Sequence, residues 1–221
     1  MDETALSQLY LKDTAFKNLM QRRIFNVLLI SSPYDAFMLE DDGRVEEQLF
    51  FEYMALILRS PPRFTQVSNY DEAYNQLIAK KFDLVIAMPG VDKRETFEQA
   101  KKIKWLYPEI PIVVLTPFSR EVSRRLANED FGGVDYVFSW LGNVDLLLAI
   151  IKLLEDRMNA VNDINEVGVQ LILLVEDSIR FYSSVLPTLY KFLLRQSLIF
   201  STEALNEHEK MLRLRGRPKV M

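Results

Sequence analysis

Two adjacent carboxylates, Glu176 and Asp177, offer the clearest metal-binding chemistry in the sequence. They directly follow the apolar run 171–175 (LILLV), which predicts a strand buried on both faces. Neighbouring carboxylates at the end of a strand suit Mg²⁺, a hard cation that prefers oxygen ligands. Two carboxylates without a third ligand rarely hold Mg²⁺, however, and Asp177 could instead cap the following helix. The residues alone leave a weak magnesium site and a helix cap equally open.

Other reactive side chains are scarce. The chain of 221 residues has no cysteine and a single histidine, His208. These counts exclude disulfides and cysteine nucleophiles, and they argue against zinc sites and histidine-centred triads. The formal charge of −4 argues against a nucleic-acid partner, because such binders usually carry a large basic excess. The basic residues near the end of the chain are typical of a solvated helix end: Arg213, Arg215, Arg217 and Lys219.

No apolar stretch of the sequence is long enough to cross a bilayer as a helix. The most apolar runs, at 27–30, 110–115 and 146–154, are far shorter than the about 20 residues that a membrane helix needs. The acidic N-terminus lacks the apolar core of a signal peptide. We therefore expect a cytoplasmic protein without a membrane partner.

Strands and helices alternate along most of the chain. Apolar runs predict strands at 25–30, 64–67, 83–88, 112–116 and 135–138. Amphipathic segments predict helices at 45–59, 71–80, 92–107, 119–129 and 144–159. Five strand–helix repeats favour a parallel sheet covered on both faces. The expected fold is therefore α/β, a flavodoxin-like doubly wound sheet of five parallel strands in the order 2-1-3-4-5.

Further segments flank this unit. Residues 1–23 predict a helical extension, 24–161 the five-stranded domain, 162–168 a polar linker, and 169–221 a truncated second βα unit. The second unit comprises a strand at 169–175, an apolar helix at 178–200 kinked or broken at Pro187, a helix at 202–215 and the start of a further strand. Its apolar surface is costly to leave in water. We expect it to dock on the first domain, to pair with another chain, or to stay poorly ordered.

A doubly wound sheet places its functional site at the carboxyl ends of its strands. In the first domain these ends carry only hydroxyl and apolar side chains, namely Ser31, Ser32, Met88, Thr116, Ser139 and Trp140. None of these residues is a carboxylate, a histidine or a lysine. Acid–base and metal chemistry therefore have no evident residues here.

The first domain resembles the receiver domain of two-component response regulators. The resemblance rests on the five-fold alternation and on the segments FDLVIAMP (82–89), IPIVVLT (110–116) and GGVDYVFSW (132–140). In that family an acidic pair after the first strand holds Mg²⁺, and an aspartate after the third accepts phosphate. A Thr or Ser follows the fourth strand, and a Lys-Pro pair follows the fifth. The resemblance implies this fold and a role in bacterial signal transduction.

This chain departs from the family pattern at the positions that perform the chemistry. Ser31 and Ser32 stand at the acidic pair, Met88 at the phosphoacceptor, and Ser139 and Trp140 at the Lys-Pro pair. A thioether cannot be phosphorylated, and phosphoryl transfer also needs a divalent ion and a cation beside the product. We therefore expect a pseudo-receiver with no catalytic residue and no cofactor in the first domain.

Two positions do match the family, Thr116 and Tyr136, the latter at the place of the switch aromatic. A satisfied hydroxyl and a half-buried ring explain them more simply than a retained switching role, because single motif matches often mislead. We favour the structural interpretation.

The second unit carries the family's acidic pair. The segment ILLVEDS (172–178) aligns Glu176 and Asp177 with the magnesium-binding positions, and the matching phosphoacceptor would lie several dozen residues beyond Met221. Magnesium is therefore expected only if the rest of that domain is present. A finer resemblance links YDAFMLEDDGR (34–44), PPRFTQVS (61–68) and LILLVEDSIRFYSS (171–184) to a group of large bacterial proteins. These are related to phosphoenolpyruvate synthase and pyruvate phosphate dikinase, and they begin with paired receiver-like domains.

Three functions are compatible with this sequence. The first is a non-catalytic regulatory module that binds a protein partner or a downstream domain of the same polypeptide. Exposed aromatics at Phe138 and Trp140 would favour such binding, whereas burial would make them core residues. The second is the regulatory segment of an enzyme of the synthase or dikinase type, and the third is phosphotransfer through the second unit. We expect no enzyme activity of this chain itself, and homo-oligomers remain open.

Overall fold

The computed structural model describes residues 18–32, 45–55, 60–89, 93–116, 132–140, 144–200 and 215–221. The helices expected at 119–129 and, apart from residue 215, at 202–215 lie outside these residues. The helical extension expected over 1–23 also lies mostly outside them. Its described end, residues 18–23, is not an α-helix, so that part of the prediction is wrong.

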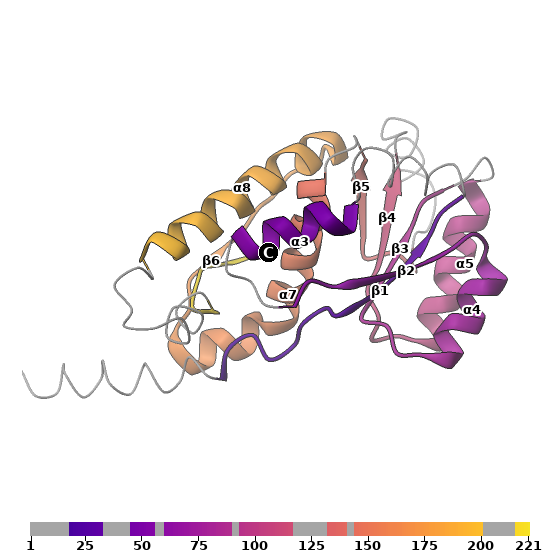
Figure 1. Cartoon of the computed structure of the whole chain (residues 1–221), viewed down its shortest axis with the longest axis horizontal. Helices are drawn as coiled ribbons and strands as arrows, with labels where there is room; N and C mark the ends of the chain where they lie inside the picture. Colours follow the sequence, from indigo (N-terminus) through magenta and orange to yellow (C-terminus); the bar gives the residue numbers. More distant parts are fainter. Residues whose placement is uncertain are drawn as a thin grey trace, which may run out of the picture.

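Five parallel strands form the central sheet, as Figure 1 shows. They are β1 (Asn26–Ile30), β2 (Arg63–Val67), β3 (Leu84–Ala87), β4 (Ile112–Thr116) and β5 (Tyr136–Ser139). Their order is β2-β1-β3-β4-β5, and every neighbouring pair is parallel. The predicted fold class and strand order are confirmed.

Helices cover both faces of the sheet (Figure 1). On one face α3 (Val45–Ala55) and α7 (Val144–Val167) pack against side chains of β1, β3 and β4. On the other face lie α4 (Tyr70–Ala79) and α5 (Lys93–Leu106). The central strands face both layers and are therefore apolar throughout, which is the pattern that the sequence shows.

Helix α7 extends further than its apolar pattern predicts. It continues past residue 159 to Val167 and ends at Gly168, whose φ of +68° suits a helix-terminating glycine. The amide N–H of Gly168 donates to the carbonyl of Ile164 at 2.8 Å. The segment 162–168, which we expected to be a linker, is therefore the last part of α7 and its cap. The division of the chain into two domains stays a prediction.

The second unit consists of a small sheet and a long helix. Strand β6 (Leu171–Ile172) pairs in parallel with β7 (Lys219–Val220), and α8 (Ile179–Phe200) follows β6. Helix α8 continues through Pro187 without a break. Figure 1 shows α8 on the side of the sheet that α3 and α7 cover. No helix within the described ranges is long and apolar enough to cross a membrane.

Candidate functional site

Six of the residues singled out from the sequence lie at the carboxyl edge of the sheet: Ser31, Ser32, Met88, Thr116, Ser139 and Trp140. Hydrogen bonds between neighbouring strands fix this edge. The N–H of Met88 donates to the carbonyl of Ile30 at 2.8 Å, and the N–H of Trp140 donates to the carbonyl of Thr116 at 3.0 Å. The structure therefore brings these residues together where the parallel topology predicts them.

Most side chains at this edge are buried. Met88 is 8% exposed and belongs to the main apolar cluster, while Ser31, Thr116 and Ser139 are almost inaccessible. The amide of Gln66 donates to the hydroxyl of Ser31 at 3.4 Å. A buried thioether cannot form an acyl phosphate, and hydroxyls are poor magnesium ligands. Across the described residues, no three His, Asp or Glu side chains come close enough together to hold a metal ion.

Tyr136 is half buried and held on two sides. Its hydroxyl accepts a hydrogen bond from Arg157 at 3.1 Å, and the guanidinium lies over its ring. The ring stacks on Phe138 with centroids 5.8 Å apart, and Phe138 stacks on Tyr182 of α8 at 5.7 Å. Burial raises the pKa of Tyr182 to about 12. This packing gives Tyr136 a structural role, and its part in any switching stays untested.

The two carboxylates of the second unit lie at the start of α8. Glu176 accepts a hydrogen bond from the N–H of Ser178 at 2.9 Å, and Asp177 is exposed. The residue that caps the helix is Ser178, whose hydroxyl accepts from the N–H of Phe181 at 3.3 Å. The sequence left Asp177 open as a helix cap or a magnesium ligand, and the structure places the cap at Ser178. Neither carboxylate has a third ligand beside it among the described residues.

Helix α8 docks on the first domain, the first of the three outcomes that its apolar surface allowed. Leu186, Tyr190 and Leu194 share one core cluster with α3, α7 and the sheet. At the end of β5 the N–H of Ser139 donates to the hydroxyl of Ser183 at 2.8 Å. Phe138 is fully buried beneath this contact, so it is a core residue and not an exposed anchor.

A row of buried polar side chains on α7 was not predicted. This row, here called the α7 charge row, consists of Lys152, Glu155, Asp156, Asn159 and Asp163. Buried charges need partners, because an unpaired ion in the interior is strongly destabilising. Apart from Tyr190 of α8 and the Lys152–Glu155 pair within the row, the partners come from the two ends of the described chain, residues 20–24 and 215–220.

Asp156 holds the end of the chain. Its carboxylate receives two hydrogen bonds from Arg217, at 2.8 and 2.6 Å, one from the hydroxyl of Tyr190 at 2.9 Å and one from the N–H of Val220 at 3.1 Å. Burial alone would lower the pKa of Arg217, but Asp156 outweighs this effect and the pKa lies above its ordinary value. Arg217 is therefore a permanent buried cation.

Lys219 forms the second contact of this kind. Its ammonium group lies 2.9 Å from the carboxylate of Asp163 and donates to the carbonyl of Arg215 at 2.9 Å. Burial lowers the pKa of Lys219. The prediction of a solvated basic helix end is therefore wrong for Arg217 and Lys219, because both side chains are buried against α7.

Glu155 holds the segment that leads into β1. It accepts from the N–H of Ile24 at 3.1 Å and pairs with Lys152 at 2.7 Å and with Arg23 at 3.9 Å. Burial lowers the pKa of Lys152, and Glu155 opposes that shift. The ammonium group of Lys152 lies 4.8 Å from the centroid of the Tyr53 ring, and the buried hydroxyl of Tyr53 has no hydrogen-bond partner among the described residues.

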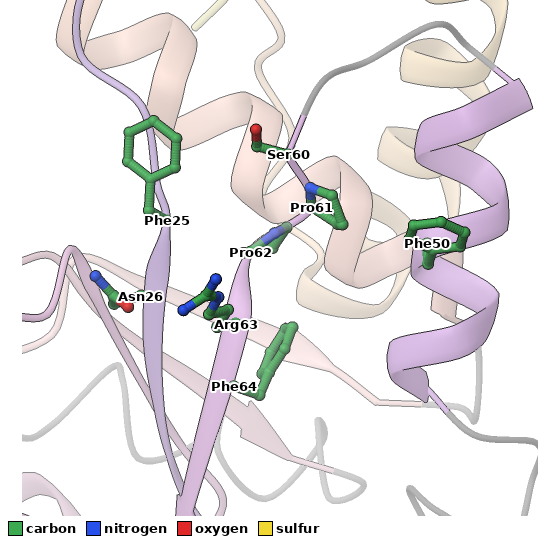
Figure 2. A pocket seen from close by; sticks show the side chains of 8 residues that line it. All are labelled: Phe25, Asn26, Phe50, Ser60, Pro61, Pro62, Arg63 and Phe64. Carbon is green, nitrogen blue, oxygen red and sulfur yellow. The ribbon is translucent and has the colours of Figure 1, made fainter.

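A cavity of about 820 Å³ opens at the opposite, amino-terminal edge of the sheet. This basal pocket is lined by Phe25, Asn26, Phe50, Ser60, Pro61, Pro62, Arg63 and Phe64 (Figure 2). The sequence pattern did not link these residues into one site, because they come from β1, α3, β2 and the turn before β2. Only the fold brings them together.

The fold and the carboxyl edge define a doubly wound α/β domain of the flavodoxin-like class. No family model and no curated protein matches the chain. Among solved structures it is similar to a signal receiver domain of an HD domain-containing protein from Pseudomonas fluorescens. The identity is 20%, the coverage is 58% of this chain and 85% of the other, and the TM-score is 0.37.

Two further structures are similar. The response regulator TrrA from Thermotoga maritima, in complex with Mg²⁺ and BeF, shares 20% identity over 58% of this chain and 97% of its own, with a TM-score of 0.43. A signal receiver domain of a histidine kinase from Syntrophus aciditrophicus shares 21% sequence identity with this chain. The match covers 60% of this chain and 91% of the other, with a TM-score of 0.41. Scores this low carry no functional argument, and the strand order stands on the chain's own hydrogen bonds.

Proposed function

We propose that this chain is a receiver-like regulatory module that does not accept phosphate. The observation that carries the proposal is the buried Met88 at the end of β3, with Ser31 and Ser32 in place of an acidic pair. A receiver without a nucleophile and without magnesium ligands keeps the fold but loses the covalent switch. Its regulation must then come from binding and not from phosphorylation.

Phosphorylation can be tested directly. The full chain is incubated with acetyl phosphate and Mg²⁺, and intact-mass spectrometry follows the addition of a phosphoryl group. A functional response regulator treated in the same way provides the positive control. We expect no labelling of this chain. A phosphoryl group found on an aspartate of this chain would contradict the proposal.

We further propose that residues 169–221 begin a second receiver-like unit. The support is the outer face of the strand segment around β6, where Leu173 and Val175 are 73% and 81% exposed. Strand β6 pairs only with β7 among the described strands, so its other edge can accept a neighbour. The partner is then a downstream part of the same polypeptide, and Glu176 and Asp177 would hold Mg²⁺ only in the completed unit.

The gene sequence after Met221 tests this second proposal. An open reading frame that adds strands and helices of the receiver pattern would support it, and a stop codon would contradict it. The gene sequence after Met221 also tests whether the chain is the regulatory segment of a synthase or dikinase. That alternative rests on resemblance alone. A cytoplasmic location, a bacterial source and the absence of nucleic-acid partners stay proposals of the same kind.

A further inference from the structure

The basal pocket has the size of a small-molecule site and several aromatic side chains in its lining. Its volume of about 820 Å³ falls within the range of about 300–1,000 Å³ that is typical of ligand pockets. Three phenylalanines contribute to its wall, and two of them, Phe25 and Phe50, are each 45% exposed. Aromatic rings left open in a cavity offer a flat apolar surface to a ligand.

The polar and apolar parts of the lining are separated. Figure 2 shows the guanidinium of Arg63 on the side of β2 that faces Asn26, and the ring of Phe64 on the side that faces Phe50. Among the described lining residues, Arg63 is the one ionisable side chain, and none is acidic. The described part of the lining therefore combines the positive charge of Arg63 with an aromatic surface.

Hydrogen bonds of their backbone groups hold three of the residues that line the basal pocket, Phe25, Asn26 and Arg63. The carboxylate of Asp83 accepts hydrogen bonds from the N–H groups of both Phe25 and Asn26, at 2.9 and 2.8 Å. The N–H of Arg63 donates to the carbonyl of Phe25 at 2.8 Å. A guanidinium outside the pocket, that of Arg23, lies 5.4 Å from the ring of Phe25.

The turn that enters β2 is also restricted. Ser60 has a φ of +56°, a left-handed conformation that non-glycine residues seldom adopt, and two prolines follow it. A turn constrained in this way holds the rim of the pocket in one shape. Pre-organised walls lower the cost of ordering a site when a ligand binds.

We propose that the basal pocket binds a small aromatic carboxylate. The flat body lies among Phe25, Phe50 and Phe64, and the carboxylate pairs with the guanidinium of Arg63. Arginine suits this role because its planar fork donates two parallel hydrogen bonds to a carboxylate. Asn26 lies on the same side of β2 as the guanidinium of Arg63. The basal pocket lies at the opposite edge of the sheet from Met88 and Ser31, so the inference does not rest on the proposed function.

The test uses 2-naphthoate as the probe and neutral 2-naphthamide as its matched control. Saturation-transfer NMR and titration with the full chain measure both dissociation constants. For a probe of this size we expect a dissociation constant for 2-naphthoate near or below about 1 mM. Arg63→Gln should weaken 2-naphthoate about tenfold and change 2-naphthamide by less than about twofold, since only a charged hydrogen bond is lost.

Two variants of neighbouring phenylalanines distinguish binding in the pocket from binding to the exposed apolar surface. Phe50→Ala should weaken both probes about fivefold or more, because the ring lines the pocket. Phe51→Ala is the control, since Phe51 is 66% exposed on the same helix but is not among the described lining residues. Circular dichroism verifies that each variant folds. If Phe50→Ala does not fold, the affinity of Arg63→Gln for 2-naphthoate still tests the proposal. No binding of 2-naphthoate, an unchanged affinity in Arg63→Gln, or equal losses in both phenylalanine variants would overturn the proposal.

Discussion

Replacing Arg217 by methionine should show whether the second unit is docked on α7 in solution. The guanidinium and the carboxylate of Asp156 are 3% and 0% exposed and share two hydrogen bonds. The variant leaves a buried carboxylate whose remaining donors are the hydroxyl of Tyr190 and the N–H of Val220. Breaking a buried ion pair typically costs about 3–5 kcal/mol. The two remaining donors place the expected loss near the lower end, at about 3 kcal/mol.

A double-mutant cycle separates the ion pair from general damage. Asp156→Asn alone leaves the guanidinium of Arg217 buried and unpaired, so we expect a loss of about 3–5 kcal/mol. The double variant removes both members of this ion pair, and the asparagine oxygen can still accept from Tyr190. It should cost only about 1–2 kcal/mol, less than either single variant, because removing both ions avoids an uncompensated charge.

Urea unfolding followed by circular dichroism measures all these free energies. Arg195→Met on the exposed surface of α8 is the matched control and should stay within about 0.5 kcal/mol of the wild type. If Arg217→Met also stays within about 1 kcal/mol, or if the two single losses simply add, the pair is not buried in solution. The docking of the second unit on α7 would then be refuted.

Two further predictions concern buried tyrosines and one glycine. Burial raises the pKa of Tyr53 and Tyr190 well above 10, so folding stability should fall as the pH rises above about 10, where unfolded tyrosine ionises. Urea unfolding should show a smaller fall between about pH 9 and about pH 11 for Tyr190→Phe, and an equal fall would contradict the assignment. Gly133→Ala should destabilise by about 1–3 kcal/mol in the same assay, because its Cβ would lie within 2.5 Å of backbone atoms of Lys101. A loss of less than about 0.5 kcal/mol for Gly133→Ala would refute the steric explanation.

The fold was predictable from the sequence because the central strands are apolar without interruption. In β4 all five residues are buried, and the neighbouring β3 is buried throughout. Such runs, alternating with amphipathic helices, are typical of a parallel sheet covered by helices on both faces. The carboxyl edge followed from the same alternation, since parallel strands end on one side. The positions of Ser31, Met88 and Thr116 were therefore predictable without any structure.

The α7 charge row could not be predicted in the same way. Polar residues on a helix are usually solvated, and periodicity does not show whether a polar face meets water or another part of the chain. The partner of Asp156, Arg217, is 61 residues away in the sequence. Helix α8 presents a similar ambiguity, because its apolar residues are not confined to one face. The basal pocket depends on four separate segments, and no local pattern links them.

The packing of α8 also bears on whether Tyr136 can act as a switch. Its ring stacks on Phe138, and Phe138 stacks in turn on Tyr182 of α8. A rotation of Tyr136 would break a ring contact worth about 0.5–1.5 kcal/mol and the hydrogen bond from Arg157. It would also disturb the stack that joins β5 to α8. The geometry therefore favours a fixed ring within the stack that joins β5 to α8.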